Sequence, residues 1–412
     1  IRDNNGNRDL GDIVNSPIVA VGGYLATAAN DGMVHIFKKN GGSDERSYNL
    51  KLSYIPGTMP RKDIESNDST LAKELRAFAE KGYVGDRYGV DGGFVLRRIT
   101  DDQDKQKHFF MFGAMGLGGR GAYALDLSKI DGNYPAAAPL FDVKNGDNNG
   151  KNRVKVELGY TVGTPQIGKT QNGKYSAFLA SGYAAKQIDD PTNKTALYVY
   201  DLENTSGSLI KKIEAPGGKG GLSSPTLVDK DLDGTIDIAY AGDRGGKMYR
   251  FDLSNSDPSK WSVSTIFEGA KPITSAPAVS RLADKRVVIF GTGSDLSEED
   301  VLDTKEQYIY GIFDDDKGTV KVTVQNGTGG GLLEQVLKEE NKTLFLNKGS
   351  DGSGSKGWVV KLKEGQRVTV KPIVVLRTAF VTIRSYTGND KCGAQTAILG
   401  INTADGGALT PR

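Results

Sequence analysis

Residues 224–252 read SPTLVDKDLDGTIDIAYAGDRGGKMYRFD, and this stretch predicts the repeating unit of the fold. It opens with a small residue and a proline, which fits the start of a strand because the missing N–H removes no ladder hydrogen bond there. An acidic loop then leads to a strand over 235–241, a Gly-rich turn over 243–246 and another strand over 247–252. Short apolar runs separated by such turns are typical of antiparallel hairpins. The stretch therefore predicts three consecutive antiparallel strands.

The same pattern recurs along the chain. An apolar strand, a turn rich in Gly, Asp or Asn, and a second short strand occupy four more stretches, which are 24–37, 108–126, 175–201 and 286–314. A small residue followed by proline also occurs at Pro17, Pro165 and Pro277, each ahead of one of these hairpins. Repeats of this size indicate a solenoid or a propeller, and antiparallel hairpins favour the propeller.

We therefore expect an all-β fold, a β-propeller of four-stranded antiparallel blades. A blade takes about 40–45 residues, so we expect about seven blades, within a range of about six to eight. Residues 1–412 are expected to form a single propeller domain with short helical insertions near 41–90 and 315–356. The apolar spacing over 69–81 predicts a helix there, and 332–337 is interpreted as a second short helix.

Composition excludes several classes of protein. Glycine accounts for 54 of the 412 residues without a three-residue period, which excludes collagen. The single cysteine excludes an internal disulfide and a thiolate zinc site. A net charge of +2 gives no general attraction to nucleic acid. No apolar run reaches the roughly 18 residues of a membrane-spanning helix, and the N-terminal residues do not resemble a signal peptide, so we expect a processed domain or a fragment.

The acidic loop inside the opening stretch carries the clearest chemistry. It reads D-x-D-x-D-G-x-x-D over 229–237, with the glycine at its sixth position. Calcium takes six to eight oxygen ligands, and a tight loop of alternating carboxylates supplies them. The predicted calcium ligands are the four carboxylates and one backbone carbonyl, which belong to Asp229, Asp231, Asp233, Thr235 (carbonyl) and Asp237.

This loop differs from a helical EF-hand. The twelfth position, where an EF-hand carries glutamate, is Tyr240, and predicted strands flank the loop. An acidic solvated turn without an ion is the alternative interpretation. Four like charges within nine residues repel one another without a cation, which favours the calcium site, and magnesium fits less well because it needs stricter octahedral geometry.

Other candidate sites are weaker. The polar loop with Asp142, Asn145, Asp147 and Asn149 is interpreted as a turn, with a second ion as the alternative. The run 314–316 is interpreted as a solvated acidic turn. Cys392 is interpreted as a buried thiol, with a reactive thiol or pairing outside this fragment as the alternatives.

Two further features also favour structural roles. The Gly-rich segment 116–121 is followed by strand residues and lacks the helix N-terminus that would hold phosphate. His35 and His108 lie in predicted strands, where packing is expected, and no nucleophile elbow accompanies them.

Several stretches, taken in order, resemble the C-terminal propeller of the PilC/PilY family of type IV pilus biogenesis factors and tip-associated adhesins. These stretches are 112–126, 159–165, 181–183, 229–243, 272–277 and 290–294. The resemblance runs from about residue 15 to the C-terminus. It implies a modified seven-bladed propeller with calcium in the acidic loop. Residues 41–90 and 315–356 fit the family pattern poorly.

The resemblance also implies a function. We expect a non-enzymatic domain that supports pilus extension against retraction, twitching motility and host-cell adherence. Its expected partners are pilins or minor pilins and the host-cell surface, with no nucleic acid and no small-molecule substrate. The expected location is the bacterial cell surface, at the outer membrane or the pilus tip.

Two alternatives remain open. A quinoprotein-like propeller dehydrogenase shares the architecture and calcium, but it characteristically carries adjacent cysteines and repeated tryptophan motifs. This chain has one cysteine and two tryptophans, Trp261 and Trp358. An integrin-α-like calcium propeller that serves as a scaffold is the other alternative, although such proteins repeat the acidic loop in several blades.

Overall fold

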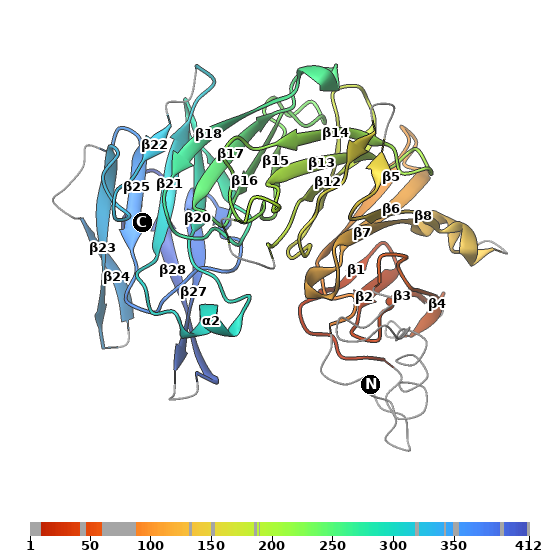
Figure 1. Ribbon diagram of the computed structural model, residues 1–412, viewed down its shortest axis with the longest axis horizontal. Helices are drawn as coiled ribbons and strands as arrows, with labels where there is room; N and C mark the ends of the chain where they lie inside the picture. Colours follow the sequence, from red (N-terminus) through yellow and green to blue (C-terminus); the bar gives the residue numbers. More distant parts are fainter. Residues whose placement is uncertain are drawn as a thin grey trace. The chain divides into compact units, whose positions relative to one another are not determined.

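The computed structural model describes most of the chain. The described residues are 10–41, 47–59, 88–131, 134–149, 153–184, 188, 190–317, 321–341, 343–348, 354–387 and 391–409. The chain divides into two compact units, one of residues 1–185 and 197–212 and the other of 186–196 and 213–412. Each unit is described by itself (Figure 1). That residues 1–412 form one propeller domain stays a prediction.

The first unit contains up-and-down antiparallel sheets of four strands, the construction of a propeller blade. One sheet is made of β1 (Ile18–Val21), β2 (Tyr24–Ala28), β3 (Val34–Lys39) and β4 (Tyr48–Tyr54). The next is made of β5 (Phe94–Thr100), β6 (Gln106–Ala114), β7 (Gly121–Asp126) and β8 (Pro139–Lys144). A third falls mainly in this unit and is made of β11 (Gln166–Lys169), β12 (Tyr175–Ala180), β13 (Ala196–Asp201) and β14 (Leu209–Glu214).

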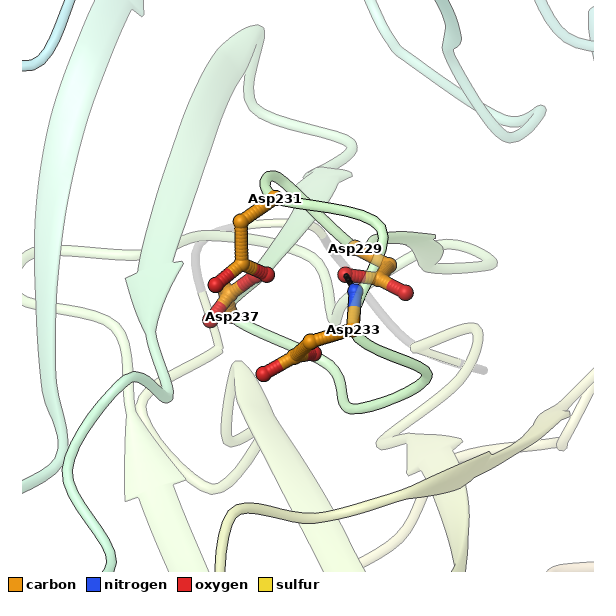
Figure 2. Close-up of side chains that lie close together, drawn as sticks. All are labelled: Asp229, Asp231, Asp233 and Asp237. Atoms are coloured by element: carbon orange, nitrogen blue, oxygen red, sulfur yellow. Dashed lines mark hydrogen bonds between the residues drawn. The ribbon is translucent and has the colours of Figure 1, made fainter.

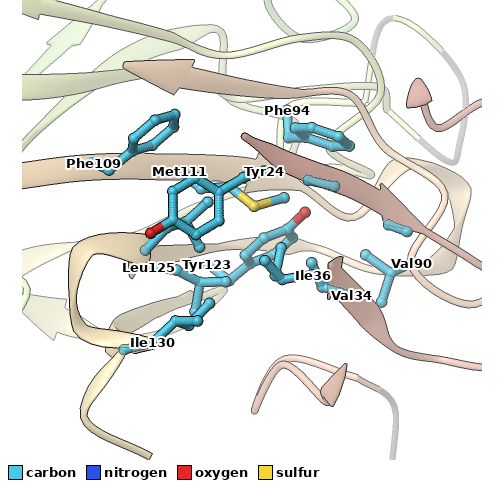
Figure 3. Packing of buried hydrophobic residues seen from close by; sticks show 14 of the residues in the cluster. Tyr24, Val34, Ile36, Val90, Phe94, Phe109, Met111, Tyr123, Leu125 and Ile130 are labelled. Carbon is cyan, nitrogen blue, oxygen red and sulfur yellow. The ribbon is translucent and has the colours of Figure 1, made fainter. Parts of the chain in front are cut away.

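Short elements lie between these strands. The two-stranded ribbon of β9 (Asn148–Asn149) and β10 (Val154–Lys155) follows the sheet of β5–β8 in the chain. The 3₁₀ turns between strands of that sheet are η1 (Gly116–Gly118), η2 (Leu127–Lys129) and η3 (Pro135–Ala137). The sheet of β1–β4 packs on the sheet of β5–β8 through a common apolar core, part of which Figure 3 shows. The rings of Tyr24 and Phe109 meet edge to face at 5.1 Å between centroids in this core. Burial of such side chains is the main stabilisation of stacked sheets.

The second unit continues with larger sheets. β15 (Thr226–Val228), β16 (Ile238–Gly242), β17 (Lys247–Asp252) and β18 (Ser262–Glu268) form a four-stranded blade, which β22 (Val322–Thr323) extends in parallel. β19 (Ala278–Arg281), β20 (Arg286–Gly291), β21 (Tyr308–Asp314) and β25 (Gly357–Lys361) form another, extended by β23 (Leu332–Glu340) and β24 (Thr343–Lys348). A last sheet has three strands, β26 (Ile373–Val375), β27 (Thr378–Thr387) and β28 (Gly393–Asn402).

The predicted all-β class and its four-stranded antiparallel blades are confirmed. The opening stretch forms β15, β16 and β17 in the predicted order, and β17 has the predicted bounds 247–252. The described ranges contain six sheets of three or more strands, which lies at the lower end of the predicted blade range.

Neither of the two helices predicted from the sequence is confirmed. The helix expected over 69–81 lies outside the described residues. The helix expected over 332–337 is wrong, because this segment lies in strand β23, which pairs with β24 and β25 and buries Leu332 and Leu337. Its Leu, Glu and Gln residues favour a helix intrinsically, but pairing on both edges overrides that weak preference.

Two short helices in the second unit were not predicted. The 3₁₀ turn η4 (Pro258–Lys260) starts at a proline, and α2 (Glu298–Leu302) is capped by Ser297, whose hydroxyl accepts a hydrogen bond from the backbone N–H of Asp300 at 3.1 Å. The three acidic residues of its first turn favour the helix N-terminus. In the part of the chain that the structure describes, no helix has the length and apolarity needed to cross a membrane.

Candidate metal centre

The loop between β15 and β16 brings four carboxylates together. One carboxylate oxygen from each of Asp229, Asp231, Asp233 and Asp237 lies within 4.8 Å of the corresponding oxygens of the others. Figure 2 shows the four side chains gathered around the inside of the loop. Among the described residues, this is the only group of three or more metal-ligating side chains with such convergence. The four predicted carboxylate ligands therefore lie close together.

The hairpin sets both ends of this loop. Val228 at the end of β15 pairs with Ile238 at the start of β16, and the backbone N–H of Asp237 donates to the Val228 carbonyl at 3.0 Å. The antiparallel register thus fixes the first and last carboxylates at neighbouring positions. Positive φ values at Leu232 (59°) and Gly234 (89°) turn the loop between them. Glycine adopts this backbone conformation readily, whereas leucine does so at a cost.

Hydrogen bonds within the loop orient the carboxylates. Asp229 accepts from the backbone N–H of Asp233 at 3.2 Å and from that of Gly234 at 2.8 Å. One oxygen of Asp233 accepts from the backbone N–H of Thr235 at 2.8 Å and from its hydroxyl at 2.7 Å. Thr235 therefore lies directly against the cluster, and the role of its carbonyl as a ligand stays a prediction.

The pKa values of Asp237 and Asp233 are shifted in opposite directions. Asp237 is only 8% exposed, and its Oδ2 accepts from the backbone N–H of Lys230 at 2.7 Å. Desolvation raises the pKa of Asp237, and the charges of Asp231, Asp233 and Asp229 raise it further. Hydrogen bonds from the Thr235 hydroxyl and N–H lower the pKa of the exposed Asp233. The loop thus holds a carboxylate in an environment where a nearby positive charge would be strongly favourable.

The residues fit a hard divalent cation. All the converging side chains are carboxylates, whose oxygens are the ligands that calcium and magnesium prefer. The positively charged side chain within the loop, Lys230, pairs with Asp316 at 2.8 Å between Nζ and Oδ2.

Most of the weaker candidates have structural roles. Asp142 accepts hydrogen bonds from the Tyr54 hydroxyl at 2.6 Å and the Gly57 N–H at 2.9 Å. His35 is buried between Asp31 and Ser53, with 2.8 Å to each, and His108 lies 2.8 Å from Asp126. Both histidines lie in strands, as predicted, and their packing role stays a prediction. A strand, β7, follows the Gly-rich segment 116–121, as predicted.

The prediction of a solvated turn over 314–316 is wrong for Asp314. This residue is fully buried at the end of β21, where its carboxylate accepts from the Tyr240 hydroxyl and lies 3.5 Å from Arg250 Nη1 and 3.8 Å from Arg286 Nη2. A signal was present in the sequence, because period-two alternation puts Asp314 on the same face as Tyr310 and Ile312. The prediction of a buried thiol is also wrong, since Cys392 is exposed in the turn before β28.

Comparisons with known proteins agree with this architecture. The family model described as the PilY1 beta-propeller domain matches residues 10–349, which include the acidic loop. The chain is 29% identical over 406 residues to the type IV pilus biogenesis factor PilY1 of Pseudomonas aeruginosa, covering 83% of this chain and 32% of that protein. It is 26% identical over 410 residues to a PilY1 homolog of Xylella fastidiosa, covering 95% of this chain and 29% of that protein. The chain therefore spans about a third of the length of these relatives.

A solved structure supports the fold. The crystal structure of the Pseudomonas aeruginosa PilY1 C-terminal domain matches with a TM-score of 0.67 at 24% identity, covering 94% of this chain and 80% of that one. This likeness concerns the fold, whereas the family model matches the sequence over most of the chain. The chain belongs to the family of PilY1 β-propeller domains.

Proposed function

We propose that this domain binds one calcium ion in the loop over 229–237 and that it is the calcium-responsive propeller of a type IV pilus biogenesis protein. The convergence of four carboxylates within 4.8 Å carries the first part of this proposal. The ligands would be the carboxylates and the Thr235 carbonyl predicted above. Family membership and the names of the relatives support the second part.

Charge and geometry favour calcium over an empty acidic turn. The carboxylates of Asp229 and Asp233 are already ordered by hydrogen bonds from the loop backbone, so little further ordering is needed on binding. Bound calcium would supply the positive charge that offsets the mutual repulsion of the carboxylates. Calcium tolerates the irregular oxygen geometry of such a loop better than magnesium, which requires near-ideal octahedral coordination.

The names of the relatives support the proposed biological role. The relatives are named type IV pilus biogenesis factors, so we expect pilins or minor pilins as partners and a location at the bacterial surface or pilus tip. In this proposal the domain has no enzymatic activity, and its calcium-loaded state supports pilus extension, twitching motility and adherence to host cells. In this proposal Lys230 couples the calcium loop to the neighbouring sheet, because it lies inside the loop and forms an ion pair with Asp316, which follows β21.

Calorimetry tests the metal site directly. The 412-residue chain should bind about one calcium ion with a measurable heat, bind magnesium more weakly, and lose calcium binding in the Asp237→Ala variant. Asp284→Asn is the matched control, because Asp284 is an exposed carboxylate of the same unit outside the loop. Equal calcium binding by wild type and Asp237→Ala would show that the loop is not the site.

Pilus assays test the function separately. The full-length protein carrying Asp237→Ala should give fewer surface pili and smaller twitching zones, with protein levels matched to the wild type. Intact motility and adherence in a variant that has lost calcium binding would favour the integrin-α-like scaffold instead. If titration of the domain with a quinone cofactor produces a new absorbance band, this would favour the quinoprotein-like dehydrogenase alternative.

A further inference from the structure

The second unit contains a groove next to the acidic loop. Its volume is about 800 Å³, and residues of β15, β19 and β26 line it together with Asp229 and Leu232 of the loop. The hydroxyl of Thr226 on β15 donates to the carbonyl of Pro277, just before β19, at 2.5 Å, which holds these two strands side by side. Strands from three sheets therefore line the groove, and β20 adds Arg286 to the residues of β19.

The walls of the groove are mostly aliphatic. Each strand contributes branched side chains to the lining, which include Leu227, Val228, Val279, Ile373 and Val374. Ile373 is 64% exposed and Leu232 is 78% exposed. Exposed aliphatic side chains that gather in a concave surface, unlike isolated ones, are typical of a binding site.

One positive charge in the lining has no partner. Within the described ranges, the ammonium of Lys371 takes part in no hydrogen bond or ion pair, whereas Arg286 pairs with Asp316 at 2.7 Å and Arg281 donates to the carbonyl of Lys230. Although part of its side chain is exposed, desolvation lowers the pKa of Lys371. An anionic group that enters the groove can therefore form a charge-assisted hydrogen bond with the Lys371 ammonium.

The strands that flank the groove favour an extended peptide over a small acid. β15, β19 and β26 each stand at an edge in the strand order of their sheets, as far as the described residues show. An edge strand presents backbone N–H and C=O groups that can pair with another extended chain. Alternate side chains of an added strand can then enter aliphatic pockets.

From this arrangement we infer that the groove binds an extended peptide segment of a partner protein, in which an aspartate or glutamate stands beside aliphatic residues. The carboxylate pairs with Lys371, and the aliphatic side chains contact Val279 and Ile373. This groove adjoins the proposed ion-binding carboxylates and shares Asp229 with them, and Leu232 of the same loop also lines it. It does not depend on the proposed role in pilus biogenesis.

Selection from a library of random heptapeptides displayed on phage tests the inference, with the 412-residue chain as target. Enriched peptides should share an acidic residue beside Ile, Leu or Val, and one of them is then synthesised and its affinity measured by fluorescence anisotropy. Lys371→Gln, Ile373→Asp and replacement of the acidic peptide residue by its amide should each weaken binding about tenfold, as expected for losing one charge-assisted or apolar contact. Lys260→Gln, an exposed lysine outside the groove, should bind as the wild type does.

The substitutions are chosen so that folding does not obscure the result. Lys371 and Ile373 are exposed, so the melting temperatures of both variants should match that of the wild type. Enrichment without a recurring acidic residue, or wild-type affinity in Lys371→Gln, would overturn the inference. Competition by isovalerate at the concentrations where the peptide binds would also overturn it, because a small aliphatic acid would then suffice.

Discussion

Lys230, between the first two aspartates of the acidic loop, forms an ion pair with Asp316, 2.8 Å from Nζ to Oδ2. Asp316 follows β21 and also accepts a hydrogen bond from Arg286 Nη2 at 2.7 Å. Arg286 Nε in turn donates to the Tyr240 hydroxyl at 3.2 Å, and this hydroxyl donates to the buried Asp314. The acidic loop is thus linked to the sheet of β19–β21 by a continuous polar network.

Neutralising Asp316 should lower stability in a pH-dependent way. The hydrogen bond from Arg286, followed by that from Lys230, holds the pKa of Asp316 below its usual range. A depressed folded-state pKa stabilises the fold above the unfolded-state pKa of about 4, and this contribution is lost as the pH falls through the folded-state pKa. Because Asp316 is partly exposed, Asp316→Asn should cost about 1 kcal/mol at pH 7. Urea unfolding from pH 7 to pH 2 measures this difference.

The neighbouring residue provides the control. Asp315 is exposed, its carboxylate accepts from the Lys317 N–H at 3.0 Å, and it forms no ion pair among the described residues. Asp315→Asn should therefore unfold much like the wild type at every pH. A difference between wild type and Asp316→Asn that stays constant down to pH 2 would contradict the electrostatic explanation.

Removal of one buried hydroxyl should be more costly. Burial and the adjacent Asp314 carboxylate raise the pKa of Tyr240, which keeps its hydroxyl protonated as a donor. Tyr240→Phe leaves a fully buried carboxylate without this donor, and we expect a loss of about 1–3 kcal/mol in the free energy of unfolding. Tyr123→Phe is the matched control, because the Tyr123 hydroxyl is buried with no hydrogen-bond partner in the described parts of the chain. Equal losses in the two variants would contradict a specific role for the Tyr240–Asp314 pair.

Features with a local cause were predictable from the sequence. The acidic loop and the strands around it depend on residue spacing within one hairpin, so the convergence of the four carboxylates followed from 229–237 alone. The hairpin strands followed from alternating apolar residues and glycine-rich turns for the same reason. The family resemblance of the ordered stretches is likewise confirmed by the family model.

Features with a distant cause were not predictable. Asp314 looked like part of a solvated acidic run, because the partners that bury it, Tyr240 and Arg286, lie on other strands. β23 looked helical because its pairing with β25 is invisible in local propensity. The groove also required the structure, since its lining comes from strands of three separate sheets.

Replacing the glycine of the acidic loop with alanine should weaken calcium binding. Gly234 has a φ of 89°, and a Cβ added there meets no atom within 4 Å, so the penalty for alanine is backbone strain alone. We expect Gly234→Ala to cost about 1–2 kcal/mol of stability and to weaken calcium binding about tenfold as the loop relaxes. Calorimetry and thermal unfolding measure the two effects.

A second glycine separates strain from metal binding. Gly365 has a φ of 80° and equally open space around its Cβ position, but it lies in the turn after β25, away from the loop sequence. Gly365→Ala should therefore lose a similar amount of stability while keeping wild-type calcium affinity. If both variants keep that affinity, the conformation of Gly234 does not matter for the metal.

Calcium should also change peptide binding in the groove, because Asp229 and Leu232 lie in the acidic loop and in the groove lining at once. In the metal-free protein Asp229 and the neighbouring carboxylates carry uncompensated negative charge beside the groove, which repels the acidic residue of the peptide. We expect chelation to weaken binding of the selected peptide about threefold to tenfold, since calcium then no longer offsets this repulsion. Asp237→Ala should bind the peptide at the weaker level with or without added calcium, whereas Asp284→Asn should respond as the wild type does. Thermodynamic coupling between two sites is reciprocal, so saturating peptide should tighten calcium binding by the same factor. If calcium does not change peptide affinity and peptide does not change calcium affinity, the two sites are independent.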